Sequence, residues 1–301
     1  MDLNDLYEDI RRHVLATLPH RTEDHAELEA IHVSDLLILY FNWRSRRVSS
    51  RPRTVHISSA LPLNPLASDP KYKPGLDQII AMIQAGDDLT PHLSRGIQYG
   101  YQGSGPPRET HLDPMLNDWG IHHLHLLIEM EPDGFVKRDG PVLFAAFRPN
   151  DAYLIDIMHH GDWVRERVMH LIIEEWPETG LMTQMTQLPS MSLSALPTED
   201  ERKKMRKAGV AAGFDIGTGI FFPDSLFTTA GTSMTQTEAA DNLLNRVRRF
   251  AELTQRPDDL AKTLADYGIV LPPNPDLHFV FFDDESYGIA ETATGITFRL
   301  A

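Results

Sequence analysis

Five histidines in the middle of the chain carry the side chain best suited to moving protons near neutral pH. Three lie within GIHHLHL, as His122, His123 and His125, and two follow AYLIDIM, as His159 and His160. If GIHHLHL is a strand, the alternation of side chains puts His123 and His125 on one face. Positioned imidazoles can remove a proton from one oxygen and return it to another. The pattern therefore predicts a histidine acid/base site in which His123 or His125 lies within reach of His159 or His160.

Acid/base chemistry on a phosphodiester also needs a cation that stabilises charge on the phosphate. The segment RSRRVSSRPR, residues 44–53, holds five arginines and no acidic residue. The candidates for substrate binding are Arg44, Arg46, Arg47 and Arg148. We expect the arginines of residues 44–53 to be largely exposed and to border the same cleft as the histidines.

The elements that must position these residues can be read from the apolar pattern. WGIHHLHLLIEM, PVLFAAF and AYLIDIM are apolar runs separated by turn signals, which predicts three adjacent antiparallel strands. The next segment, WVRERVMHLIIEEWP, has helical periodicity and ends at a proline. The central unit is therefore predicted to be strand, strand, strand, helix.

The whole chain is predicted to be α+β, with N-terminal helices, a small central antiparallel sheet followed by a helix, and a C-terminal α+β domain. The opening residues have the spacing of an amphipathic helix that stops before Pro19, and a second helix is expected over about residues 23–47. The predicted boundaries are residues 1–180 for the helical arm and sheet, 181–206 for a linker, and 207–301 for a C-terminal domain.

Composition narrows the chemistry. The 301 residues include no cysteine, which excludes disulfides, thiolate metal sites and cysteine nucleophiles. The sequence holds no run of about 20 apolar residues and no secretory signal, so no membrane partner is expected and the cytoplasm is the expected location. A net charge of −15 disfavours nucleic acid if it is spread evenly, but the arginine segment shows that it is not.

The central region resembles the endoribonuclease toxins of the RelE and YoeB kind, on the residues WGIHHLHL, PVLFAAF and AYLIDIMHHGDW. In that family a small sheet carries basic residues on successive strands, and the last strand ends in His or Tyr beside the scissile phosphate. The resemblance implies that His159 or His160 occupies the terminal catalytic position, with His123 or His125 facing the phosphate. It implies metal-independent RNA cleavage, with no cofactor and a toxin- or defence-like role.

Two other interpretations remain open. His123, His125 and Glu129 form His-x-His-x3-Glu followed by a turn glycine, Gly134, which resembles the first metal motif of the cupins and implies one divalent transition metal. Alternatively, the chain is a non-catalytic interaction or regulatory protein whose acidic surface recognises a basic partner. In every case we expect the C-terminal domain to serve binding or assembly, through a protein partner, and to carry no chemistry.

Overall fold

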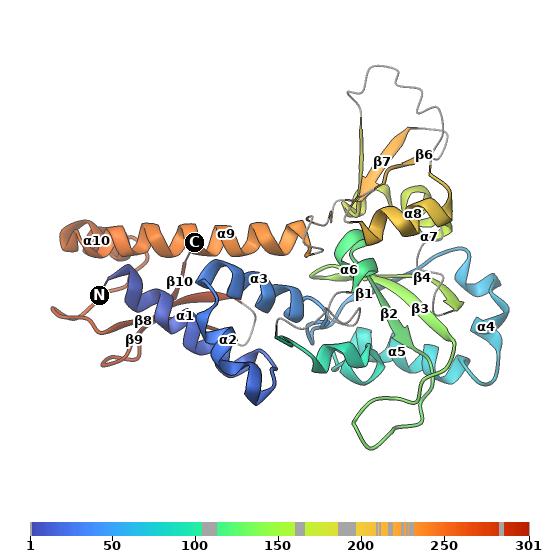
Figure 1. The fold of residues 1–301 in the computed structure, drawn as a ribbon, viewed down its shortest axis with the longest axis horizontal. Coiled ribbons are helices and arrows are strands. Elements are labelled where there is room, and N and C mark those ends of the chain that lie inside the picture. The colour runs from blue at the N-terminus through green and yellow to red at the C-terminus, as the bar shows by residue number, and fades with distance from the viewer. Residues whose placement is uncertain are drawn as a thin grey trace. The chain divides into compact units, whose positions relative to one another are not determined.

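In the computed structural model of the protein (Figure 1), the chain separates into two compact units. Unit 1 comprises residues 1–41, 100–107 and 236–301, and unit 2 comprises residues 42–99 and 108–235. The structure describes residues 2–103, 113–159, 166–185, 197–208, 210, 212–215, 219–223, 226, 228, 232–282 and 286–300. These units differ from the predicted domains. The prediction joined the N-terminal helices to the histidine-bearing sheet, whereas the structure groups residues 1–41 with the C-terminal residues 236–301.

The first helix of unit 1, α1 (Leu3–Thr17), follows directly from its sequence. Asp2 caps it by accepting the backbone N–H groups of Asn4 and Asp5, at 2.7 and 3.0 Å. Its apolar residues recur every four positions, and all three are fully buried: Leu6, Ile10 and Val14. The prediction of an amphipathic helix here is confirmed.

The prediction of a single helix over residues 23–47 is wrong. The structure has instead η1 (Thr22–Asp24), α2 (His25–Ala30) and α3 (Val33–Arg44). The break lies at Ile31, which has an extended backbone. Arg11 of α1 donates from Nη1 to the carbonyls of Glu29 and Ile31, at 2.6 and 2.8 Å, so the carbonyls left over at the end of α2 are satisfied without further helix.

The C-terminal part of unit 1 consists of two helices and a small antiparallel sheet. These are α9 (Met234–Thr254), α10 (Pro257–Ala265), β8 (Leu277–Phe281), β9 (Tyr287–Glu291) and β10 (Thr297–Arg299). The strand order is β10-β9-β8, so the two predicted strands, LHFVFF and GITFRL, both pair with β9 rather than with each other. Asp9 of α1 accepts the backbone N–H of Phe279 at 2.9 Å, which attaches α1 to the edge strand β8.

Unit 2 is built around a four-stranded sheet of order β1-β4-β3-β2. Its strands are β1 (Thr54–Ile57), β2 (Ile121–His125), β3 (Pro141–Phe147) and β4 (Asp151–His159). β2, β3 and β4 are antiparallel neighbours, as predicted, and β1 is parallel to β4. The register of β3 and β4 shifts between Phe144 and Ala145, which leaves Ile155 as the extra residue of a β-bulge.

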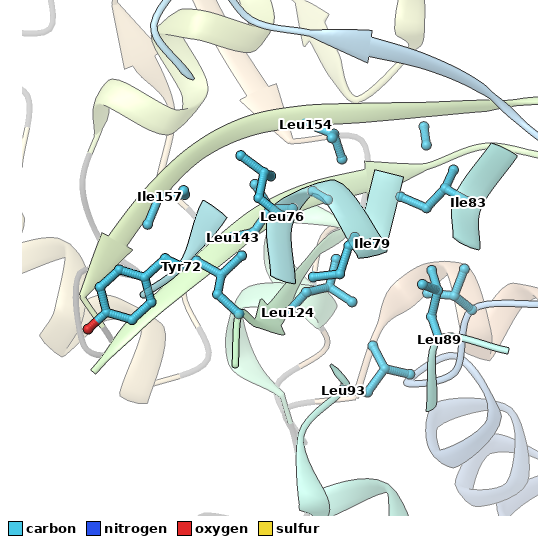
Figure 2. Close-up of a cluster of buried hydrophobic side chains, with 14 of the residues drawn as sticks. Tyr72, Leu76, Ile79, Ile83, Leu89, Leu93, Leu124, Leu143, Leu154 and Ile157 are labelled. Atoms are coloured by element: carbon cyan, nitrogen blue, oxygen red, sulfur yellow. The ribbon is translucent and has the colours of Figure 1, made fainter. Parts of the chain in front are cut away.

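Helices cover both faces of this sheet. The short helical segments of unit 2 are η2 (Leu61–Leu63), α4 (Pro65–Ser68), η3 (Thr90–His92), η4 (Arg95–Gln98) and η5 (Pro177–Thr179), and its longer helices are α5 (Lys73–Ala85), α6 (Pro114–Trp119), α7 (Glu166–Glu175) and α8 (Glu199–Lys207). Leu76 and Ile79 of α5 pack on Leu124, Leu143 and the rest of one face (Figure 2). α6 and α7 cover the other face.

The region expected to be a linker belongs instead to unit 2. β5 (Met182–Gln184) pairs with β7 (Ile220–Pro223), which also pairs with β6 (Phe214–Asp215). α8 is attached to α7 by the buried Arg202, which donates to Glu166 and to the Gly213 carbonyl and lies over the ring of Phe214. Sheet pairing and the contacts of Arg202 therefore hold β5 and α8, the two described elements of a stretch whose composition alone looked like a connection.

Candidate functional site

The histidines of β2 lie on the two faces that strand alternation predicts. His123 and His125 share the α6–α7 face with Ile121, and His122 lies on the α5 face with Leu124. The rings of His123 and His125 meet edge to face, with centroids 6.0 Å apart. Both side chains are buried: His123 is 5% exposed and His125 is 2% exposed.

One carboxylate and one further imidazole complete this group. Asp113 caps α6 by accepting the backbone N–H of Leu116 at 3.0 Å, and its other oxygen lies 3.6 Å from Nδ1 of His123. His92 of η3 donates from Nδ1 to the carbonyl of His125 at 2.7 Å and is 1% exposed. We call His92, His122, His123, His125 and Asp113 the β2 histidine cluster.

Burial favours the neutral imidazole at two members of this cluster, His122 and His92, because it lowers the pKa of each. Desolvation lowers the pKa of His122 to about 4, although the charge of Asp113 acts in the opposite direction. Nε2 of His122 lies 3.2 Å from the carbonyl of Ser45, and its Nδ1 has no hydrogen-bond partner among the described residues. Burial also lowers the pKa of His92. His92 and His122 therefore behave as core histidines that satisfy backbone carbonyls.

His159 does not join this cluster on the α6–α7 face. It is the exposed last residue of β4. The preceding residue, Met158, packs in the α6–α7 core with Val142, which is the register partner of His125. Strand alternation therefore directs His159 to the face opposite His125. β2 and β4 do belong to one sheet, as predicted, while His160 lies outside the described residues.

The expectation that the arginines of residues 44–53 are exposed is wrong for Arg46 and Arg53, which are 8% and 7% exposed. Arg46 donates from Nη1 to the carbonyls of Gly96 and Tyr99, at 3.2 and 3.1 Å, and burial lowers its pKa to about 10. Arg53 donates to the carbonyls of Arg148 and Ser49. The irregular backbone around η4 and before β1 has carbonyls without ladder partners, and guanidinium groups supply the missing donors.

The two remaining arginines of the predicted site near α3 are only partly exposed. Arg44 is the last residue of α3. The guanidinium of Arg47 lies over the ring of Trp43, 4.0 Å from the ring centroid, and donates from Nη2 to the carbonyl of Ile97 at 3.4 Å. Packing therefore explains much of this basic segment.

Glu129, the third ligand of the alternative metal site, lies in exposed chain after β2. Its carboxylate pairs with Nζ of Lys137 at 3.1 Å. Within the part of the chain that the structure describes, no group of three His, Asp or Glu side chains has the arrangement of a metal site. His123 and His125 are neighbours there, without Glu129.

An accessible histidine–carboxylate pair, which no motif in the sequence indicates, occurs elsewhere in unit 2. His56 of β1 has its Nε2 2.8 Å from Oδ1 of Asp151, the first residue of β4, and each side chain is 37% exposed. The ring of His56 stacks on Tyr153, with centroids 4.8 Å apart and planes inclined by 14°. The pair depends on the parallel pairing of β1 with β4, which joins residues 95 positions apart.

Arg148, a predicted substrate-binding residue, precedes β4, and its backbone N–H donates to the carbonyl of Asp151 at 2.8 Å. Its Nε donates to the carbonyl of Thr179 at 3.1 Å. Burial raises the pKa of Tyr153, the charges of Asp151 and Glu178 raise it further, and Arg148 opposes them. Arg148 and Asp151 thus both act on the hydroxyl of Tyr153, and the aromatic ring joins them to His56. We call His56, Asp151, Tyr153 and Arg148 the β1–β4 site.

Comparisons with protein-family models, with characterised proteins and with solved structures find nothing that matches this chain. Across the described segments, no helix combines the length and the apolar character needed to cross a membrane.

Proposed function

We propose that unit 2 cleaves RNA phosphodiesters without a metal, with His56 as the general base. The observation that carries this proposal is the 2.8 Å contact between His56 and Asp151 on two side chains that are each 37% exposed. A catalytic base must be reachable by its substrate and oriented by a third group. The β1–β4 site meets both requirements, whereas the buried β2 histidine cluster meets only the second.

The contact with Asp151 selects the tautomer of His56. Nε2 carries the proton and donates it to the carboxylate, so Nδ1 holds the lone pair. Nδ1 takes the proton of a ribose 2′-hydroxyl, and the 2′-oxygen forms a bond to phosphorus. The bond from phosphorus to the 5′-oxygen breaks, water protonates the leaving oxygen, and the hydroxide so formed takes back the proton from Nδ1 of His56. The products are a 2′,3′-cyclic phosphate and a free 5′-hydroxyl, and Asp151 stabilises the imidazolium formed on the way.

Arg148 supplies the cation in this scheme. A guanidinium keeps its charge at every relevant pH and offers paired donors that fit phosphate oxygens. Nε of Arg148 is held by the Thr179 carbonyl, and its Nη groups have no hydrogen-bond partner among the described residues. They are therefore free to bind the phosphate as negative charge develops on its oxygens.

A second candidate function is supported by the burial of the β2 histidine cluster. Buried histidines such as His123 and His125 suit a structural role, and a chain of net charge −15 suits a basic protein partner. In this proposal the chain is a regulatory or interaction protein, and unit 1, with its helices and small sheet, offers the binding surface. The RNase proposal keeps a toxin- or defence-like role in the cytoplasm.

The deciding experiment is cleavage of a single-stranded RNA by the full chain in the presence of EDTA. We expect chelator-resistant cleavage that leaves a 2′,3′-cyclic phosphate, with Asp151→Asn lowering the rate about tenfold or more because the base loses its orienting carboxylate. Cleavage that EDTA abolishes would favour the metal alternative. Absence of cleavage together with capture of a basic protein partner would favour the interaction protein.

A further inference from the structure

Unit 2 has a second arginine, Arg167, whose outer donors can bind an anion. It lies near the part of β4 that extends beyond the end of β1. Arg167, in the first turn of α7, has a side chain that is 61% exposed, and its Nε lies 3.3 Å from Oδ2 of Asp156. Asp156 itself is 3% exposed. A buried carboxylate that anchors an exposed guanidinium fixes the direction of the arginine while leaving its outer donors in solvent.

The position of Asp156 is set by the way β4 continues after its neighbour ends. β1 stops at Ile57, so the β4 carbonyls beyond the paired stretch need other donors. Ser58 donates from Oγ to the Ile155 carbonyl at 2.5 Å, and Asn64 donates from Nδ2 to the Ile157 carbonyl at 2.7 Å.

The same amide of Asn64 also binds the carboxylate. Its Nδ2 lies 2.6 Å from Oδ1 of Asp156, which further accepts the backbone N–H of Ile157 at 2.9 Å. One oxygen of Asp156 is thus occupied by the sheet edge, and the other is directed to Arg167. The two Nη groups of Arg167 have no hydrogen-bond or ion-pair partner within the described segments.

The chain between His56 and Asn64 connects the two sites along one edge. Ser59 is held to α7 by Glu175, which accepts both its backbone N–H and its hydroxyl, at 2.9 and 2.7 Å. Two apolar side chains of this stretch stand in solvent, Ile57 at 46% and Leu63 at 83% exposure. Cations spaced along an edge that also offers apolar surface suit a strand whose bases are unpaired.

We propose that Arg167 binds an RNA phosphate other than the scissile one, so that the substrate is a single strand lying along the β1–η2 edge from the His56 site to Arg167. This inference rests on the proposed function. It makes Arg167 a substrate-positioning residue and Asp156 the group that orients it. A dinucleotide has only the scissile phosphate and so offers nothing for Arg167 to bind, whereas a strand of ten nucleotides carries further phosphates.

The test compares the full chain with its Arg167→Gln variant on a dinucleotide and on a decamer of single-stranded RNA. We expect kcat/KM for the decamer to fall about tenfold and kcat/KM for the dinucleotide to stay unchanged. Arg256→Gln is the matched control. Arg256 is similarly exposed, at 64%, and is also paired to a carboxylate at 3.3 Å, but it is the N-cap residue of α10 in unit 1. It should alter neither substrate. Equal loss on both substrates, or no loss on the decamer, would overturn the inference.

Binding separates this inference from the proposed function. Decamer affinity is measured over a range of salt concentrations, on a His56→Gln background so that the RNA stays intact. The Arg167→Gln change should weaken binding and reduce the salt slope by about one, as loss of one phosphate contact does. If no RNA is cleaved but binding depends on Arg167 and not on Arg256, the inference stands without the nuclease. If the decamer does not bind, or binds equally well without Arg167, the inference fails whether or not cleavage occurs.

Loss of Arg167 leaves Asp156 without its cation, so folding is checked by thermal unfolding. Should Arg167→Gln fail to fold, Arg167→Lys serves instead, because it keeps a positive charge beside Asp156 but lacks the forked donors. We expect the lysine variant to bind the decamer several-fold more weakly than the unaltered chain and to cleave the dinucleotide normally. Full decamer binding by the folded lysine variant would overturn the forked phosphate contact.

Discussion

The β2 histidine cluster and the β1–β4 site both contain a histidine beside an aspartate, yet their surroundings differ. In the cluster, His123 is 5% exposed and lies 3.6 Å from Asp113, among core side chains of the α6–α7 face. In the β1–β4 site, His56 is 2.8 Å from Asp151, and both side chains are 37% exposed. The difference shows that density of histidines in the sequence is a weaker guide to chemistry than the access of one oriented imidazole to solvent.

Each site also has arginines, and they are used differently. Near the cluster, Arg46 is buried and donates its hydrogen bonds to two backbone carbonyls. Beside His56, Arg148 has only its Nε engaged by a carbonyl, so its outer donors are available. The cluster therefore belongs to the core that holds β2 in place, and the β1–β4 site is the one whose polar groups can meet a substrate.

The largest expected effect separates the two histidine sites by rate. His56→Gln should lower RNA cleavage by about 10²–10⁴-fold while leaving the fold intact, because it removes the base and keeps a polar side chain of similar reach. His125→Gln should reduce stability instead, with little loss of turnover per folded molecule. Rates normalised to the folded fraction, measured by circular dichroism, check both. A folded His125 variant without activity, beside an active His56 variant, would reverse the comparison.

The second effect is the pH dependence of stability that the buried cluster imposes. Burial lowers the pKa of His122 from the ordinary histidine value of 6.5, which applies to the unfolded chain, to about 4 in the folded chain. Above pH 6.5 both states are neutral at this group, and between pH 6.5 and 4 only the unfolded chain binds the proton, so stability is lost as the pH falls. The loss has an upper limit of about 3–4 kcal/mol, at about 1.4 kcal/mol per pKa unit. Urea unfolding across this range measures it.

His122→Gln is the variant for this measurement, because it removes the titrating group and retains a donor for the Ser45 carbonyl. Its stability should vary less between pH 6.5 and 4 than that of the unaltered chain. His159→Gln, at the exposed end of β4, is the matched control. An unchanged slope in the His122 variant would show that other groups set the acid sensitivity.

Sequence patterns predicted much of the fold of unit 2. The apolar runs and turn signals correctly gave three antiparallel strands and a following helix, and alternation correctly paired His123 with His125 on one face. Those features depend on local periodicity, which a sequence displays directly. Burial was not predictable in the same way. The local sequence around a histidine on a strand is the same whether α6 or solvent covers that face of the sheet.

The features that were missed depend on contacts between distant residues. His56 meets Asp151 only because β1 lies parallel to β4, and no local pattern in TVHI announces that neighbour. The break between α2 and α3 needs Arg11 from another helix. The division into units was missed for the same reason, since α1 attaches to β8 through Asp9 and Phe279, which are 270 positions apart.

A smaller effect tests whether Arg46 is structural. Arg46→Lys should destabilise the chain by about 1–3 kcal/mol, because a lysine cannot serve both the Gly96 and Tyr99 carbonyls, and a buried acceptor is left unsatisfied. RNA affinity and its salt dependence should not change in the folded protein. Arg51→Lys, in the same basic segment, should change neither quantity. A stable Arg46 variant with weakened RNA binding would show instead that Arg46 binds the substrate.

The smallest expected effect is that of Glu129→Gln on stability and zinc binding, and it tests the alternative metal site. The carboxylate is 68% exposed and pairs with Lys137 at 3.1 Å. Exposed pairs of this kind contribute about 0–1 kcal/mol, so Glu129→Gln should unfold at nearly the same urea concentration as the unaltered chain. If His123, His125 and Glu129 nevertheless gather around a metal in solution, removing one of three ligands should weaken zinc binding by at least about tenfold. Titration calorimetry with zinc on both proteins distinguishes the two. We expect no difference, because His123 and His125 are enclosed on the α6–α7 face while Glu129 stands in solvent beyond the end of β2.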